Sequence, residues 1–358
     1  MKNFYNISLM LATIFVCNIL GFAQEDYFVP KTTLGGYGEL HYNYVKNGNA
    51  KSTRTLDFHR FVLFFAHSWS EKWSLKSEVE IEHNLIEGGD KGAVELEQAY
   101  LNYQASDAFG VQVGVILPSV GLINEFHEPP VFMGVERPEY DTYIIPTTWF
   151  GNGAAVYGNV KGFDYKFTVM EGLKGDNFKA GSGIREGRQE GFKSDASDLL
   201  YNARLDYLNI PGLKIGASFT YNNATGDSVN NQVKLFETHA KYLADNIYAA
   251  FEYGNISFDE GNIKSSEGYY FDLGYNVADI VKTSSQIIPF VRYTDYNTAS
   301  STRSGGDIEK MYHFSKWMVG ISFKPVGSVV LKADYSERTR ELGSVKTKLF
   351  NLGAGYMF

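Results

Sequence analysis

Charged residues recur at every second position along short segments of this chain. Lys76, Glu78, Glu80 and Glu82 share one side of a segment whose other side is apolar. Alternation with a period of two predicts a β-strand rather than a helix. Such a row of charges either covers the solvated outside of a soluble sheet or lines a water-filled interior, and the other segments must decide between the two.

Catalytic and metal-binding arrangements are weak in this sequence. A hydrolase needs a nucleophile, a base and an orienting group in one place. The seven histidines are scattered, and no Gly-x-Ser-x-Gly elbow stands out. His127 and Glu128 are adjacent, but no second histidine follows at a ligand spacing. We therefore expect no enzymatic activity, no catalytic residues, no cofactor and no metal site.

The N-terminus has the parts of a secretory signal peptide. Lys2 supplies the positive charge, residues 7–21 the apolar core, and Gly21-Phe22-Ala23 the cleavage site. We expect residues 1–23 to be removed after export. Cys17 lies inside the apolar core, so the processed chain would hold no thiol.

Composition excludes several classes of protein. The formal charge is −8 and no basic run is present, which argues against nucleic acid as a partner. Beyond the signal segment no apolar stretch is long enough for a membrane-spanning helix. No linker-like change in composition divides the chain, so residues 24–32 are interpreted as a periplasmic leader and residues 33–358 as one domain.

The chain is a succession of alternating segments of about ten residues, the length of a membrane-spanning β-strand. We identify sixteen of them, and their alternation breaks near His59 and Arg60, which indicates a β-bulge or a strand that protrudes beyond the membrane. Long links such as 222–233 follow odd-numbered segments, and short links such as 244–246 follow even-numbered ones. A soluble sandwich or propeller would not be expected to keep this asymmetry.

The sequence therefore predicts an all-β fold, a 16-stranded antiparallel transmembrane β-barrel with long extracellular loops and short periplasmic turns. Eighteen strands remain possible if one of the two longest links, 118–150 or 172–198, hides a further pair. An even strand number is required if both termini lie on the periplasmic side.

The last strand ends in a polar residue, a glycine two positions later, and aromatic residues at the last and third-last positions. These are Asn351, Gly353, Tyr356 and Phe358. The pattern resembles the assembly signal that ends outer-membrane β-barrel proteins, which implies the barrel-assembly machinery and outer-membrane lipid of a Gram-negative bacterium as partners. The same residues would also suit a half-buried edge strand of a soluble sheet.

Barrels of sixteen to eighteen strands leave an aqueous channel, so the polar strand faces should line it. The basic candidates are Arg60, Lys76, Arg204, Lys214, Lys241, Arg292, Lys316 and Lys332. The acidic candidates are Glu39, Glu78, Glu80, Glu82, Asp206, Glu237, Glu252, Asp272 and Asp334. The two sets nearly balance, which favours a mixed field over a channel that strongly prefers one sign of charge.

Residues 118–150 are the candidate constriction loop. Their charged residues are Glu125, His127, Glu128, Glu136 and Arg137. These side chains could form an eyelet that faces the opposite wall. They could equally pair with each other or with the wall to anchor the loop, because an inserted loop must satisfy its buried charges.

Residues 57–158 resemble the phosphate-selective porin O/P family and its porin-like relatives. The resemblance rests on the loop that opens with Pro118-Ser119-Val120-Gly121 and closes with Ile144-Ile145-Pro146-Thr147-Thr148-Trp149, and on its flanking glycine-rich strands. It implies an outer-membrane porin, a homotrimer that passes small hydrophilic solutes or ions, including anions such as phosphate, by passive diffusion. The alternative is a non-conducting barrel subunit of a larger outer-membrane assembly, with residues 172–198 as a partner surface or a solvated loop.

Overall fold

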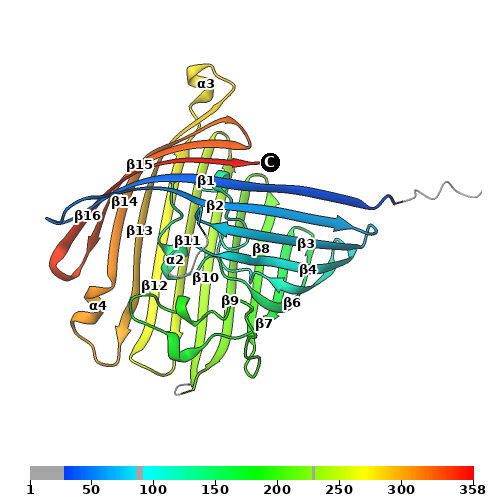
Figure 1. Ribbon diagram of the computed structural model, residues 1–358, viewed down its shortest axis with the longest axis horizontal. Helices are drawn as coiled ribbons and strands as arrows, with labels where there is room; N and C mark the ends of the chain where they lie inside the picture. The colour runs from blue at the N-terminus through cyan, green and yellow to red at the C-terminus, as the bar shows by residue number, and fades with distance from the viewer. Residues whose placement is uncertain (1–27, 86–91, 228–229) are drawn as a thin grey trace, which may run out of the picture.

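The computed structural model describes residues 28–85, 92–227 and 230–358. Within these ranges, sixteen antiparallel strands form one closed barrel (Figure 1). Each strand pairs with its neighbours in chain order, and β1 pairs with β16. The predicted fold is confirmed. The expected signal peptide and the first residues of the expected leader lie outside the described residues.

The barrel wall consists of strands of unequal length. They are β1 (Lys31–Asn47), β2 (Thr53–Ser68), β3 (Trp73–Glu82), β4 (Val94–Ser106), β5 (Phe109–Ile116), β6 (Gly151–Val160), β7 (Phe163–Met170), β8 (Leu200–Ile210), β9 (Leu213–Thr225), β10 (Asn230–Ala244), β11 (Ile247–Phe258), β12 (Ile263–Tyr275), β13 (Gln286–Thr302), β14 (His313–Val326), β15 (Val329–Arg340) and β16 (Val345–Met357). β1 takes in the last two residues of the expected leader, because β2 extends far enough to pair with them.

Short helices interrupt the links. They are η1 (Pro129–Val131), α2 (Tyr140–Tyr143), η2 (Gly175–Asn177), η3 (Arg185–Gly187), α3 (Ala278–Val281), α4 (Asp307–Met311) and η4 (Leu342–Ser344). α3 and α4 project from opposite ends of the barrel (Figure 1). Among the described residues, no helix is both long and apolar enough to cross a membrane.

Alternation along the strands separates an apolar outer face from a polar inner face. On β12, Leu273 is 44% exposed whereas its neighbour Asp272 is fully buried. On β14, Val319 is 45% exposed, and it pairs with Val291 on one side and Tyr335 on the other. Large apolar side chains on the outside, with no second sheet to cover them, require a lipid environment.

The predicted break in alternation near His59 and Arg60 is a β-bulge. Glu39 pairs with Arg60 and Leu40 with Phe58, so His59 has no opposite residue in β1. A bulge adds one residue to one strand and redirects its side chains. Here it brings His59 to the inner face, where its ring stacks on that of His41.

A second bulge, which the alternation did not reveal, lies in β4. Gln98 pairs with Glu78 and Leu96 with Val79, so Glu97 is the extra residue. Both Gln98 and Glu97 therefore face inward, and Glu97 is 1% exposed. Both bulges place an additional polar side chain on the inner wall near the same region of the barrel.

The C-terminal residues close the barrel. The Phe358 amide donates to the Gly36 carbonyl at 2.9 Å, and the Gly36 amide donates to the Phe358 carbonyl at 3.0 Å. Asn351 faces inward and donates to Asp334 Oδ1 at 2.8 Å. Tyr356 and Phe358 lie on the outer face, 36% and 59% exposed.

A charge on the outer face should destabilise the barrel. We expect Val319→Arg to lower the free energy of unfolding by about 2–4 kcal/mol, because the guanidinium would enter the hydrocarbon region. Denaturant titration of the protein in lipid vesicles, followed by tryptophan fluorescence, measures this. Val319→Leu is the size-matched control. Equal stability of the two variants would contradict the assignment of this face to lipid.

Candidate constriction site inside the barrel

Residues 118–150 leave the wall after β5 and cross the interior, where α2 lies within the ring of strands (Figure 1). The Leu122 amide donates to Glu252 Oε2 on β11 at 2.9 Å. The Val135 amide donates to Asp334 Oδ2 on β15 at 2.8 Å. Because β11 and β15 lie far around the ring from β5, the segment spans the interior. We call it the constriction segment.

One buried asparagine holds the two ends of the constriction segment together. The Asn124 side-chain amide donates to the Pro118 carbonyl at 2.9 Å and to the Trp149 carbonyl at 3.1 Å. Its oxygen accepts from the Trp149 amide at 2.8 Å. Asn124 is fully buried, so these three bonds replace water for the backbone groups at the neck of the segment.

Glycines in the wall make room for the apolar side of the segment. A Cβ on Gly254 would lie 2.6 Å from the Tyr140 hydroxyl, and a Cβ on Gly355 would lie 2.5 Å from Pro129. A Cβ on Gly353 would lie 2.9 Å from Val135. Gly353, predicted as part of the assembly signal, therefore also has a packing role against the constriction segment.

A second segment, residues 172–198, packs over the first. Arg185 donates to the Thr147 carbonyl at 2.8 Å, and Arg188 donates to the carbonyls of Pro146 and Thr148. Burial and the Arg188 guanidinium lower the pKa of Arg185 to about 10. These two arginines are thus turned toward the interior, unlike the solvated loop or partner surface considered from the sequence.

Glu125 anchors the constriction segment to the wall near β7. Its carboxylate accepts from Lys166 at 2.6 Å and lies 3.7 Å from Arg204. Arg204 also donates to the Gly121 carbonyl at 2.7 Å. Burial opposes ionisation, but Lys166 and Arg204 together lower the pKa of Glu125.

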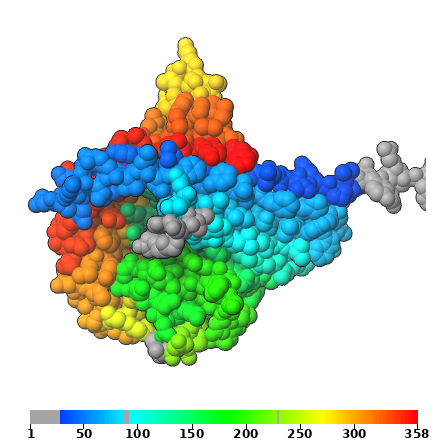
Figure 2. All heavy atoms as spheres, viewed as in Figure 1, coloured from blue at the N-terminus to red at the C-terminus, as the bar shows by residue number. Residues whose placement is uncertain are grey.

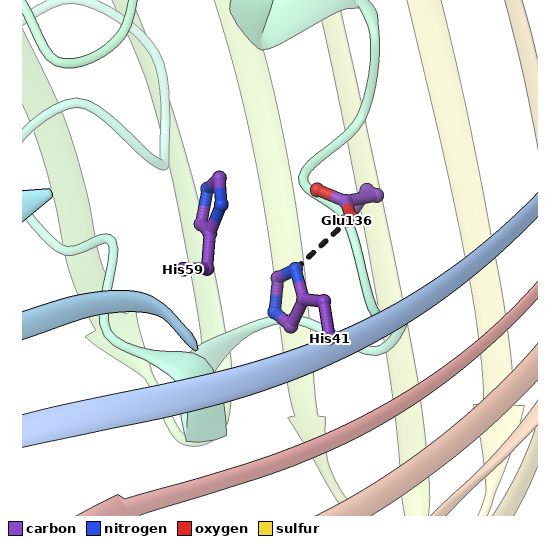
Figure 3. A group of neighbouring side chains, drawn as sticks. All are labelled: His41, His59 and Glu136. Atoms are coloured by element: carbon purple, nitrogen blue, oxygen red, sulfur yellow. Dashed lines mark hydrogen bonds and ion pairs between the residues drawn. The ribbon is translucent and has the colours of Figure 1, made fainter. Parts of the chain in front are cut away.

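Glu136 lies on the opposite side of the segment, near β1. Figure 3 shows it bonded to His41, with His59 beside the pair. The distance from His41 Nδ1 to Glu136 Oε1 is 3.0 Å, and the rings of His41 and His59 are 4.8 Å apart. Burial opposes ionisation of Glu136, but the hydrogen bond from His41 outweighs it and lowers the pKa of Glu136 to about 2.

His127 is buried between the segment and the wall. Its Nε2 lies 3.3 Å from Glu97 and 3.5 Å from Glu78. Burial opposes the charged ring, but these carboxylates raise the pKa of His127 to about 10. Glu128 follows at the start of η1 and lines a neighbouring cavity.

Arg137 is the basic residue of the constriction segment. Its Nη1 donates to Thr148 Oγ1 at 3.3 Å. Within the described chain, its Nε and Nη2 have no hydrogen-bond partner. Burial and the nearby Arg60 guanidinium lower the pKa of Arg137.

The predicted channel-lining side chains lie on the inner face of the wall. Those that are buried there are Arg60, Glu78, Glu80, Arg204, Glu237, Arg292, Lys316 and Lys332. Lys76, Lys214 and Lys241 are more exposed. Several of these charges pair within the wall, including Arg292 with Asp272 at 2.6 Å and Arg204 with Asp206 at 2.9 Å.

The constriction segment borders two cavities whose walls hold both charged and apolar side chains. One, of about 430 Å³, is lined by Asn43, Glu136 and Arg185 and lies toward the long links; we call it the loop-side cavity. The other, of about 450 Å³, is lined by Thr33 and Lys76 and lies toward the short turns; we call it the turn-side cavity. Figure 2 shows a hollow between the blue first strands, the orange and red last strands and the green residues 172–198. All three parts contribute residues to the loop-side cavity.

Two residues at the constriction were not identified from the sequence. Glu139 pairs with Lys316 at 3.1 Å and with Arg338 at 3.5 Å. Glu139 lies two residues after Arg137 in the same charged loop, so its position in the sequence could have identified it as a candidate. Arg185 was assigned to a loop at the surface, and its contact with the constriction segment has no sequence signal.

No protein-family model matches this chain. A relative from Aquifex aeolicus (strain VF5), described as an uncharacterized protein, is 33% identical over 339 residues. The alignment covers 87% of this chain and 77% of that protein.

Solved structures with this fold are outer-membrane proteins of low sequence identity. The anion-selective porin of Comamonas acidovorans has a TM-score of 0.62 at 13% identity, over 92% of this chain and 100% of that one. OmpF of Salmonella typhi, in complex with daunomycin, has a TM-score of 0.65 at 12% identity, over 92% and 98%. The trimer form of Vibrio cholerae OmpT has a TM-score of 0.58 at 13% identity, over 92% and 100%. The chain thus has the barrel fold of porins.

Loss of the Asn124 side chain should release the constriction segment. We expect Asn124→Ala to leave three buried backbone groups without partners, at a cost of about 1–3 kcal/mol each. A glutamate-specific protease should then cleave the folded barrel after Glu125 or Glu136, sites that are protected in the parent protein. Asn102→Ala, which changes a wall asparagine, is the control. A segment that stays uncleaved in Asn124→Ala would contradict the anchoring role.

Proposed function

Because the chain belongs to one family with the Aquifex aeolicus protein and has the fold of outer-membrane porins, we propose that it is an outer-membrane porin. It forms a water-filled channel for passive diffusion of small hydrophilic solutes or ions. The observation that carries this proposal is the charged inner face of the wall, with a cavity that holds charged side chains on each side of the constriction segment. A wall built only for packing would bury apolar side chains there instead.

The charged side chains at the constriction support a channel with weak ion selectivity that also admits anions. The acidic residues Glu39, Glu82, Glu136 and Glu139 line the loop-side cavity beside Arg60 and Lys316, so both signs of charge face it. A mixed lining passes ions of both signs, since selectivity needs an excess of one.

An anion preference, including phosphate, would arise from two further arginines in the same cavity. Arg137 and Arg185 donate to hydroxyl or carbonyl oxygens of residues 147 and 148. Guanidinium groups engaged in this way keep charge available for a permeating oxyanion. This is the feature that supports membership of the phosphate-selective porin O/P family.

The proposal includes the location and assembly expected from the sequence. The protein is exported by its signal peptide, inserted into the outer membrane by the barrel-assembly machinery, and forms a homotrimer. Support for the homotrimer comes from the trimer form of the structurally similar Vibrio cholerae OmpT.

The second candidate is a non-conducting barrel subunit of a larger outer-membrane assembly. The observation that favours it is the apolar core that the two inserted segments build inside the barrel. Ile144, Ile145 and Ile184 are all fully buried in it. If that core extends across the whole section, the interior is plugged.

Planar-bilayer recording of the refolded protein separates these functions. We expect discrete conductance steps of weak ion selectivity, partly blocked by added phosphate. Arg137→Gln should weaken the phosphate block by about tenfold, the effect of losing one charge-assisted hydrogen bond of roughly 1.4 kcal/mol. Lys348→Gln, the same charge change at an exposed position, should leave the block unchanged.

Each other outcome has a definite meaning. A folded barrel with no conductance would reject the channel and favour the assembly subunit. Conductance that phosphate does not affect, or that Lys348→Gln alters as much as Arg137→Gln, would reject the anion preference while keeping the general channel.

A further inference from the structure

Three side chains from separate parts of the chain meet where the constriction segment touches the wall. Glu78 comes from β3, Glu97 from the bulge in β4, and His127 from the constriction segment. Their donor atoms all lie within 4.8 Å of one another. His127 Nε2 is 3.3 Å from Glu97 Oε2 and 3.5 Å from Glu78 Oε1.

These donor atoms are buried, and they face one another. Glu78, Glu97 and His127 are 2%, 1% and 2% exposed. In the described part of the chain, Glu78 Oε1, Glu97 Oε2 and His127 Nε2 have no hydrogen-bond partner other than one another. Buried polar atoms are nearly always satisfied, so three such atoms directed at one point indicate a ligand.

The surrounding contacts orient two of the three side chains. His127 Nδ1 is 3.1 Å from the Asn124 carbonyl, which can only accept a hydrogen. Nδ1 therefore carries the proton, and Nε2 is directed at the carboxylates. Glu78 Oε2 accepts a hydrogen bond from Gln98. Glu78 Oε1 therefore remains free to face His127 Nε2. A histidine whose second nitrogen donates to a carbonyl, and a carboxylate fixed by a neighbour, are the usual supports of metal ligands.

We propose that Glu78, Glu97 and His127 bind one divalent metal ion of the zinc type. Zinc takes nitrogen and oxygen ligands at about 2.0–2.2 Å, which puts tetrahedral donor atoms roughly 3.3–3.6 Å apart. The two measured separations, 3.3 and 3.5 Å, lie in this interval. The fourth position is left for water from the turn-side cavity, which Glu78 and His127 also line.

A protonated His127 is the competing arrangement. A proton on Nε2 supplies one hydrogen bond and leaves the other carboxylate oxygen without a full partner, whereas a metal ion satisfies all three atoms. The groups around the site are the carboxylates of Glu39 and Glu80 and the guanidiniums of Arg60 and Arg137. Glu78 and Glu97 bring two carboxylates to one point beside a neutral His127, which favours a cation there.

The second histidine group, shown in Figure 3, does not have these features. Both nitrogens of His41 are already bonded, to Glu39 at 3.1 Å and to Glu136 at 3.0 Å. His59 is in addition 3.2 Å from Asp57. This group satisfies itself, so it serves as the internal control.

A metal at the proposed site would join the constriction segment to two strands of the wall. Three ligands from β3, β4 and residue 127 would fix the segment beside the turn-side cavity. The site would set how rigidly the segment is held, and it does so whether or not the barrel conducts.

Zinc content tests the proposal. The refolded chain is stripped with a chelator, equilibrated with Zn²⁺ and analysed by atomic emission. We expect one zinc per chain. Glu97→Gln and His127→Gln should each lower the affinity by at least about a hundredfold, and Gln98→Ala by roughly tenfold. His59→Gln removes the residue that the group in Figure 3 shares with a neighbouring group of Asp57, His59 and His83. This variant should still bind one zinc.

Two results would overturn the proposal. One is a stripped parent chain that takes up no zinc. The other is zinc that is lost in His59→Gln but kept in Glu97→Gln and His127→Gln. Gln98→Ala keeps all three ligands, so it remains informative if the ligand variants fail to fold. Metal content is measured independently of conductance, so this test can fail while the porin proposal stands.

Discussion

Closure of the sheet is the constraint on which the rest of the structure depends. Lipid cannot satisfy backbone hydrogen bonds, so a membrane-spanning sheet must have no open edge. The pairing of β1 with β16, from Tyr37 with Met357 to Asn47 with Thr347, removes it. A closed barrel of this size is too wide for wall side chains to fill. Its interior must therefore hold water, an inserted segment, or both.

The constriction segment occupies part of that interior, and three of its carboxylates pair with basic side chains of the wall. Glu125 pairs with Lys166, Glu136 with His41, and Glu139 with Lys316. Anchoring and facing the interior, which the sequence left as alternatives, are thus combined in the same side chains. The carboxylates that hold the segment also face the cavities, so a change in one anchor alters both the position of the segment and the field that a solute meets.

Periodicity predicted the wall but not the site. Alternation predicts which side chains share a strand face, because the direction of a side chain depends on its position relative to its neighbours in sequence. The break in alternation at His59 could be predicted for the same reason. If Gln98 faces inward, strict alternation predicts that Glu97 faces outward. The pairing of β4 with β3 contains a bulge at Glu97, and this bulge places the Glu97 side chain on the inner face. The contact of His127 with Glu78 and Glu97 joins three segments, so ligand spacing along the chain could not reveal it.

The most direct test of the account is whether water connects the two cavities. Single cysteines in a chain that begins at Gln24 would replace Asn43 in the loop-side cavity or Lys76 in the turn-side cavity. A small charged methanethiosulfonate is added only on the side of the long links. We expect both cysteines to react, because the proposed channel provides a path for water past the constriction segment. Reaction of Asn43→Cys with complete protection of Lys76→Cys would contradict the channel.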